Sequence, residues 1–234
     1  MGPICVIPAR AGSKRVPGKN MRDLGGKPLV RWIAEACVKS DIFESIIVST
    51  DSDEISEVAQ SIDQVHVAPR PPELAADDVR AEQVFRHVIS LIPDNERPEV
   101  ACMAMPTAPF TRPEDLRSAY ALMSKFEGCF LAVKTPFKTQ RTFAVNSLGG
   151  VSPVGRWDDV WKQSQDLEET YQPTYGGMFI RTDHLLEFGQ YYSPESQSIY
   201  EVEKWSGLDI DTLSDLAEAQ SWLAAQMNPL QQTE

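Results

Sequence analysis

The sequence has few of the features that mark membrane proteins and nucleic-acid-binding proteins. No apolar run approaches the roughly 20 residues of a membrane span, and the apolar start before Arg10 is too short for a signal peptide. Lys and Arg total 22 against 34 Asp and Glu, a formal net charge of −12. Nucleic acid and anionic membranes both require a positive face. We therefore expect a soluble, cytoplasmic protein with no nucleic-acid or membrane partner.

Cysteine and histidine are also scarce. The 4 cysteines and 3 histidines show neither CxxC nor Cys/His spacing, so we expect no zinc site. Cys5, Cys102 and Cys129 lie in strand-like runs, and Cys37 lies in a helical pattern. We expect these thiols to be buried and reduced.

Short apolar runs alternate with helical periodicity through about residue 133, which is typical of strand-helix-strand units. The 234 residues, 42% of them hydrophobic, suffice for one sizeable core. The pattern predicts an α/β fold with a mainly parallel sheet. The predicted strands are 4–7, 45–50, 65–68, 100–105, 129–133, 177–181 and 199–203. The predicted helices are 28–39, 53–61, 80–91, 113–126 and 212–226, and both Pro28 and Pro113 suit a first helical turn.

Residues 134–177 interrupt the alternation with a polar, proline-marked segment rich in aromatics, which predicts a hairpin-like excursion. Exposure of Phe143, Trp157 and Trp161 on a monomer would be costly, so these side chains either pack on a second subunit or cover the parent domain. The sequence alone leaves both readings open. The resulting division is a core of residues 1–133 and 178–227, an inserted segment of residues 134–177, and a frayed tail of residues 228–234.

A basic loop, IPARAGSKRVPGKN at residues 7–20, follows the first predicted strand. Ligands of open α/β sheets bind beyond the carboxyl ends of the strands. Gly12 and Gly18 allow backbone N–H groups to approach an anion, although the Walker pattern fails because Asn20 stands where a hydroxyl is required. No GxGxxG is present either. A solvated basic loop is the alternative, but the position favours a polyphosphate site supplied with four cations: Arg10, Lys14, Arg15 and Lys19.

The same loop and five later blocks together resemble the CMP-sialic acid synthetase family, the cytidylyltransferases that activate nine-carbon acidic sugars. The blocks are GGKPLVRW, IIVSTDSDEI, RPPELAADD, MPTAPFTRPEDL and LDIDTLSDL. The resemblance runs from residue 4 to about 220. It implies a Rossmann-like three-layer nucleotidyltransferase fold, Mg²⁺ as cofactor, and CTP and a nonulosonic acid as substrates. From the aromatics of the excursion we further predict a homodimer that forms through this segment.

Two segments of the excursion are similar to the pseudaminic acid branch of that family. They are TQRTF at residues 139–143 and SQDLEETY at residues 164–171. The segment YGGMF at residues 175–179 departs from the aromatic-rich end usual in that branch. The sequence therefore leaves open which nonulosonic acid is used.

The reaction implied by the resemblance is attack of the sugar's anomeric hydroxyl on the α-phosphate of CTP, with release of pyrophosphate. This chemistry depends on holding the triphosphate and neutralising its charge. Arg10 and Lys19 are the predicted catalytic cations, and Arg70 is placed at the cytosine carbonyl. Lys14 and Arg15 are candidates for steering the nucleotide. The other predicted CTP contacts are Ala9, Ala11, Gly12, Ser13 and Asn20.

Asp209 and Asp211 form the second constellation. Residues two apart on an extended segment project from one face, so both carboxylates would point together while Ile210 enters the core. Carboxylates suit Mg²⁺. The alternative is that Asp211 is a turn or cap residue, because Thr212 and Asp215 make a capping-box start for the last helix. The resemblance favours the metal role for both acids.

Sugar contacts are predicted in the excursion, and the sequence leaves open whether the same chain or the partner subunit supplies them. A planar arginine fork suits a carboxylate, so Arg141 would pair with that of the sugar. Met105 stands where relatives often have Gln, which suggests a less polar sugar contact. Asp78 is predicted to cap the helix that begins near Arg80. The residues predicted to contact the sugar are Gln140, Arg141, Gln163, Gln165 and Tyr171.

Three other functions remain open from the sequence. They are a CMP-Kdo-type cytidylyltransferase, a glycosyltransferase that uses a nucleotide sugar, and a nucleotide-binding module without catalysis. The dense basic loop disfavours the glycosyltransferase, whose donor is already a diphosphate. Retention of both predicted catalytic cations and both acids disfavours the inactive module.

Overall fold

A computed structural model describes residues 2–13 and 16–227, and a seven-stranded sheet forms its centre. The strand order is β11-β7-β10-β6-β1-β4-β5. Only β10 runs antiparallel to its neighbours β6 and β7; the other adjacent pairs of this described sheet are parallel. The strands are β1 Ile4–Pro8, β4 Ser45–Thr50, β5 Val65–Pro69, β6 Val100–Met103, β7 Gly128–Lys134, β10 Tyr171–Arg181 and β11 Gln197–Glu201. The predicted α/β fold with a mainly parallel sheet is confirmed.

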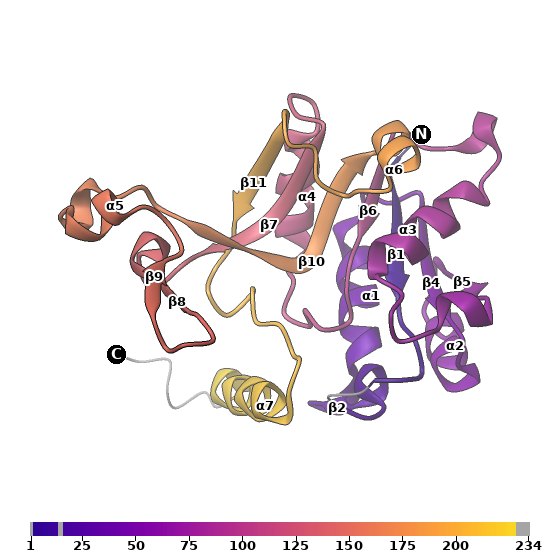
Figure 1. Ribbon diagram of the computed structural model, residues 1–234. Helices are drawn as coiled ribbons and strands as arrows, with labels where there is room; N and C mark the ends of the chain where they lie inside the picture. The colour runs from indigo at the N-terminus through magenta and orange to yellow at the C-terminus, as the bar shows by residue number, and fades with distance from the viewer. Residues whose placement is uncertain (1, 14–15, 228–234) are drawn as a thin grey trace.

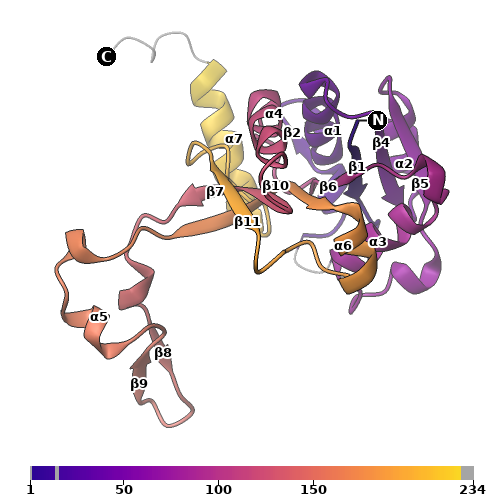
Figure 2. The ribbon, with the colours of Figure 1, turned by 90° about the horizontal axis from the view of Figure 1, so that it is seen from above.

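Helices cover both faces of the sheet, giving three layers (Figure 2). Helices α1, α2 and α4 pack on one face around Cys5, Ile7 and Leu116, and helices α3 and α6 pack on the other around Val6 and Phe85. The bounds are α1 Leu29–Ser40, α2 Asp53–Gln60, α3 Ala81–Ser90, α4 Pro113–Leu122, α6 Thr182–Phe188 and α7 Leu213–Met227. Within residues 2–13 and 16–227, no helix combines the length and the apolar character that crossing a bilayer requires.

A third, smaller core lies where α7 packs beside a short hairpin. The hairpin strands are β2 Asp23–Leu24 and β3 Lys27–Pro28, joined by two glycines with positive φ. Leu24, Phe110 and Ile210 are buried together there. This core fixes the segment that precedes α7.

The four cysteines are buried thiols, as predicted. Cys5, Cys102 and Cys129 lie on β1, β6 and β7, and Cys37 lies on α1 with its Sγ 3.6 Å from that of Cys5. Burial raises the pKa of the Cys5 thiol well above its ordinary value. These thiols are therefore inert core side chains in this state.

The excursion leaves the sheet between β7 and β10 and stands away from the core (Figure 1). It contains the antiparallel hairpin of β8 Phe143–Val145 and β9 Val151–Pro153, followed by the short helix α5 Trp157–Trp161. Trp157 and Trp161 are 52% and 80% exposed. The reading in which these aromatics cover the parent domain is therefore wrong.

Several predicted elements differ in detail. Strand β10 begins at Tyr171, six residues before the predicted start at residue 177. The sequence pattern did not indicate the first half of the strand because this half contains Pro173 and its pairing with β7 shifts register before Met178. Helix α6 was not predicted. Pro113 opens α4 as predicted, but Pro28 is the N-cap residue of α1 and not part of its first turn.

Asp78 does not cap α3, and that prediction is wrong. The helix begins at Ala81 with Arg80 as its N-cap, and Gln83 Oε1 accepts a hydrogen bond from the Arg80 N–H at 2.8 Å. This single bond satisfies the N–H of the N-cap residue without a carboxylate. The predictions for Lys14, Arg15 and residues 228–234 lie outside the described residues.

Candidate functional site

A cavity of about 370 Å³ opens beyond the carboxyl end of β1. In the sheet, β1 lies between β4, the next strand of the sheet along the chain, and β6, which is added later on the other side. Such a reversal of strand order is the switch point at which open α/β sheets bind ligands, and the loop after β1 lies there. Six of the residues predicted to bind or act on CTP line the cavity; five come from the basic loop, and the sixth follows β5. They are Arg10, Gly12, Ser13, Lys19, Asn20 and Arg70.

Internal hydrogen bonds fix the loop after β1. Asn20 is 8% exposed and its Nδ2 donates to the Arg10 carbonyl at 2.9 Å. The Ala11 N–H donates to Asp51 Oδ1 at 2.8 Å. Gly18 has a φ of 65°, which favours glycine, and it leads into a short 3-10 turn that starts at Lys19. These bonds hold the described parts of the loop, residues 9–13 and 16–20, in a defined conformation.

Both predicted catalytic cations are held by carboxylates. Arg10 Nη1 lies 2.9 Å from Asp77 Oδ1, and Lys19 Nζ lies 2.9 Å from Asp211 Oδ1. The second pair joins residues that are 192 positions apart in the chain. The structure thereby brings the basic loop and the acidic segment together.

Arg70 is a buried cation at the cavity wall, with 8% of its surface exposed. Its Nη2 donates to the Ser49 carbonyl at 2.7 Å, while its Nε finds no acceptor among the described residues. Burial lowers the pKa of the Arg70 guanidinium to about 10, and the nearby charge of Arg10 adds to this while Asp51 opposes it. A buried cation with unused hydrogen-bonding capacity is suited to a polar ligand.

The acidic segment is anchored on both sides. Ile210 is fully buried, as predicted, and its N–H donates to the Thr107 carbonyl at 2.8 Å. Asp215 Oδ2 accepts from the N–H of Thr212 at 2.7 Å, and Thr212 Oγ1 accepts from the Asp215 N–H at 3.2 Å. Thr212, not Asp211, therefore starts α7 with the capping box.

The donor set of the acidic segment fits Mg²⁺ bound together with a nucleotide. Asp209 and Asp211 are half-buried and flank the buried Ile210. Across residues 2–13 and 16–227 no group of three or more His, Cys, Asp or Glu side chains is arranged as a metal centre. A cation on these two carboxylates would thus take its other ligands from phosphate and water, which is how proteins usually bind Mg²⁺.

Two of the predicted CTP contacts are not at the cavity wall. Ala9 is fully buried, with its N–H bonded to the Ser49 carbonyl at 2.9 Å, and Ala11 contacts Asp51 through its backbone. Both shape the loop and do not line the cavity.

The predicted sugar residues gather in the excursion, away from this cavity. Gln140 Nε2 donates to the Glu168 carbonyl at 3.0 Å, and Arg141 contacts Ser164 Oγ at 3.1 Å as well as the Lys162 carbonyl. The side chains of Gln163 and Gln165 bond to each other. Tyr171 starts β10, where hydrogen bonding to Glu201 raises the pKa of its phenol. None of these five lines the cavity of the same chain.

Comparison with known proteins now identifies the family. The sequence profile described as cytidylyltransferase matches residues 4–232. The chain belongs to the cytidylyltransferase family. It is 31% identical over 218 residues to a pseudaminic acid cytidylyltransferase of Campylobacter jejuni, covering 91% of this chain and 92% of that protein. It is also 30% identical over 226 residues to a CMP-N,N'-diacetyllegionaminic acid synthase of Legionella pneumophila, covering 92% and 93%.

A solved structure supports the predicted fold of this cytidylyltransferase. A CMP:2-keto-3-deoxy-manno-octonic acid synthetase complexed with CTP superposes with a TM-score of 0.73 at 17% identity, covering 97% of this chain and 100% of that one. The predicted Rossmann-like nucleotidyltransferase fold is confirmed.

Sequence analysis missed several residues at the cytidylyltransferase cavity. Thr107 lines it directly after β6, and Val79, Ala81 and Val84 form an apolar wall with the predicted Met105. The position of Thr107 after a strand of the central sheet was a usable signal. The apolar wall was not, because Val79, Ala81 and Val84 share the helical pattern of core residues.

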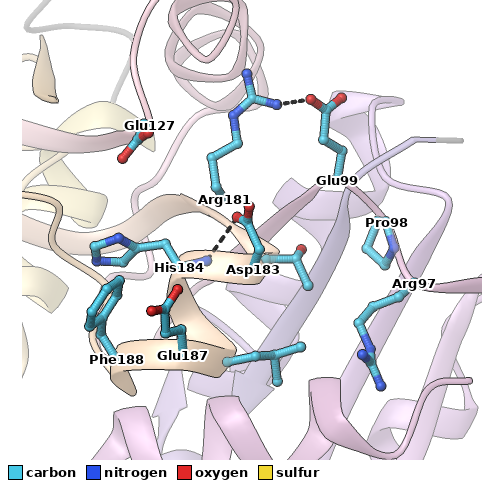
Figure 3. Close-up of a pocket in the computed structure, with 11 residues that line it drawn as sticks. Arg97, Pro98, Glu99, Glu127, Arg181, Asp183, His184, Glu187 and Phe188 are labelled. Carbon is cyan, nitrogen blue, oxygen red and sulfur yellow. Dashed lines mark hydrogen bonds and ion pairs between the residues drawn. The ribbon is translucent and has the colours of Figure 1, made fainter. Parts of the chain in front are cut away.

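A second, larger hollow of about 530 Å³ lies at the opposite end of the strands, where β6 and β7 begin and β10 ends (Figure 3). Several of its charged side chains already bond to protein groups: Arg181 pairs with Glu99, and Arg97 lies 2.7 Å from Asp94. The Asp183 carboxylate accepts from the His184 N–H at 2.8 Å. Because none of the predicted site residues lies there, we assign no part of the cytidylyltransferase reaction to this hollow.

Proposed function

We propose that this protein transfers CMP from CTP to the anomeric hydroxyl of a nonulosonic acid and releases pyrophosphate. The observation that carries the proposal is the cavity at the end of β1, where two cations of the basic loop meet Arg70 and where Lys19 lies beside Asp211. Its relatives are named for CMP transfer to pseudaminic and legionaminic acids. A synthetase of the same fold was solved in complex with CTP.

Arg10 and Lys19 are the residues that would grip the triphosphate. Each is held at the cavity by a carboxylate 2.9 Å away, and phosphate oxygens would replace those carboxylates as acceptors. Gly12 and Ser13 add a backbone with open space around it and a hydroxyl. The chain's part in the reaction is therefore to position the α-phosphate and to neutralise charge as pyrophosphate leaves.

We propose Mg²⁺ as the cofactor, held by Asp209 and Asp211. When bound to phosphate oxygens, such an ion stabilises the charge that develops in phosphoryl transfer. Asp209→Asn is expected to abolish turnover and preserve the fold, because a neutral amide is a weak magnesium ligand. Activity near that of the parent protein would favour a purely structural role for this acid.

We propose that the protein acts as a homodimer through the excursion. Leu148 and Trp161 are 94% and 80% exposed there. Large apolar side chains exposed together in one segment are typical of a protein–protein interface. Gln140, Arg141 and Gln163 lie in the same excursion, so a partner could bring them to the cavity of the first subunit. We also propose a cytoplasmic location, since reducing compartments favour the four free thiols.

One assay tests the proposed reaction. Purified protein is incubated with CTP, Mg²⁺ and, in separate reactions, pseudaminic, N-acetylneuraminic, legionaminic and 3-deoxy-manno-octulosonic acids. Pyrophosphate and CMP-sugar are then measured. We expect both products with at least one nine-carbon acid, and neither from Asp209→Asn.

Each other result identifies a different function. Turnover of the eight-carbon acid alone would indicate a Kdo-type enzyme. Binding of CTP without turnover of any acid would indicate an inactive nucleotide-binding module. In a further reaction that contains CMP-sugar instead of CTP, together with a sugar acceptor, transfer of the sugar would indicate a glycosyltransferase.

A further inference from the structure

Asp115 is a fully buried carboxylate that does not line the nucleotide cavity. It lies in the first turn of α4 and makes a two-point ion pair with Arg112, Nε to Oδ2 at 2.9 Å and Nη2 to Oδ1 at 2.8 Å. A third contact comes from Ser206 Oγ, which lies 3.2 Å from Asp115 Oδ2. The proposed reaction has so far given this carboxylate no role.

Ser206 links that carboxylate to the acidic segment. It is 2% exposed, lies three residues before Asp209, and shares its hydroxyl hydrogen between Asp115 and the Phe110 carbonyl, whose oxygen is 3.0 Å away. The next anchor is the bond from the Ile210 N–H to the Thr107 carbonyl. Asp209 is therefore suspended between two attachments to the same stretch of chain, residues 107–115.

The segment between these attachments has little room to shift. A Cβ on Gly207 would lie 2.3 Å from Val133 Cγ1 and 2.7 Å from Thr174 Cγ2, so the backbone passes directly against β7 and β10. Its path is set by backbone packing at Gly207. The hydrogen bonds of the Ser206 hydroxyl fix the position of the backbone directly before Gly207.

Stability alone is a poor reason for burying Asp115. Desolvating a carboxylate costs free energy that an ion pair often fails to recover, and an apolar pair of similar volume is frequently as stable. A charged acceptor does, however, fix a hydroxyl more firmly than a neutral one does. This contrast points to orientation of Ser206 as the use of the buried charge.

We propose that Asp115 is a positioning residue which, through Ser206, places Asp209 for binding a divalent cation. The inference rests on the proposed function, in which Asp209 and Asp211 hold Mg²⁺. Outer-shell partners of metal ligands tune affinity in this way, and their loss typically weakens binding about 10- to 100-fold. Asp115 would then act on the cation without contacting it.

The test is a direct titration of metal with the Ser206→Ala variant. Mn²⁺ binding to the CTP-loaded protein is followed by water-proton relaxation, and CTP binding is measured separately in EDTA. We expect the Mn²⁺ dissociation constant to rise roughly 10-fold, the lower end of the range for outer-shell partners. The effect should be at this lower end because the variant leaves the ion pair between Asp115 and Arg112 in place. CTP affinity in EDTA should stay unchanged, and excess Mg²⁺ should restore the lost turnover.

Ser193→Ala is the matched control. Ser193 is also 2% exposed and its Oγ also bonds to a carboxylate, Glu127 Oε2 at 3.1 Å, but it precedes β11 at the far edge of the sheet. It should leave Mn²⁺ affinity unchanged. Asp115→Asn should weaken Mn²⁺ binding at least as much as Ser206→Ala; if Asp115→Asn does not fold, Ser206→Ala alone decides.

The outcomes separate this inference from the function beneath it. If Ser206→Ala binds Mn²⁺ like the parent while Asp209→Asn does not bind it, the positioning role is refuted and the proposed metal pair stands. If Ser193→Ala weakens binding as much as Ser206→Ala does, the effect is general destabilisation and the inference fails. If Asp209→Asn binds Mn²⁺ like the parent, the metal pair itself is wrong and the positioning role falls with it.

Discussion

Replacing Arg70 by Met should weaken CTP binding and stabilise the fold at the same time. The guanidinium is 8% exposed, and its Nε has no acceptor among the described residues. The Ser49 carbonyl would not be orphaned by the change, because the Ala9 N–H also donates to it at 2.9 Å. Met would fill the volume with a flexible apolar side chain.

The expected change in the free energy of unfolding of Arg70→Met is the difference between two opposing contributions. Leaving a buried donor unsatisfied costs about 1–3 kcal/mol, and the lost bond to Ser49 contributes about 1 kcal/mol, so Arg70→Met should gain about 1 kcal/mol. In a protein of this size that corresponds to a Tm rise of about 2–4 °C. A hydrogen bond to a charged group contributes about 1.5–3 kcal/mol, so CTP affinity should fall roughly 10- to 150-fold.

Thermal unfolding and CTP titration of the same preparation test this prediction. Arg97→Met is the control, because Arg97 also has an Nε without an acceptor among the described residues but lines the hollow at the opposite end of the strands. It should leave CTP affinity unchanged. A fall in Tm of several degrees for Arg70→Met, or unchanged CTP affinity, would refute the reasoning.

Three further predictions concern the fold and its assembly. Burial alone would raise the pKa of the Glu35 carboxyl, but ion pairs with two neighbouring cations lower it below its ordinary 4.5. Glu35→Gln should therefore cost about 0.5–1 kcal/mol by urea unfolding at pH 7, and the difference should vanish as pH falls through the lowered pKa; an equal cost at pH 2 would contradict this. Gly207→Ala places a Cβ 2.3 Å from Val133 Cγ1 and should cost about 2 kcal/mol, so an unchanged urea midpoint would mean that the backbone yields there. The parent protein should scatter light as a dimer at micromolar concentration, and Trp157→Ser with Trp161→Ser as a monomer; a monomeric parent rejects the interface.

The sequence predicted the elements whose patterns are local and strong. Strands such as β1 and β4 are short apolar runs between helices with clear periodicity, so alternation alone revealed the parallel sheet. The first half of β10 was missed because it contains Pro173 and leads out of the sheet toward the excursion. Moreover, no local sequence pattern indicates that this strand runs antiparallel to its neighbours β6 and β7.

The candidate site was predicted in its composition better than in its contacts. Position after a buried strand indicated the role of the basic loop, and the resemblance connected it to the acidic segment. The partners of the cations were beyond prediction, since Asp77 and Asp211 meet Arg10 and Lys19 only through the fold. Asp78 was misassigned because the helix starts later than predicted, with Arg80 as its N-cap and with Gln83 accepting from the Arg80 N–H.

The most direct test of the account is a crystal structure of the protein with CTP and Mg²⁺. We predict the triphosphate in the cavity beyond β1, with Arg10 and Lys19 on its oxygens and the ion between the phosphates and the carboxylates of Asp209 and Asp211. Nucleotide bound elsewhere, with Arg10 still on Asp77 and Lys19 still on Asp211, would contradict it.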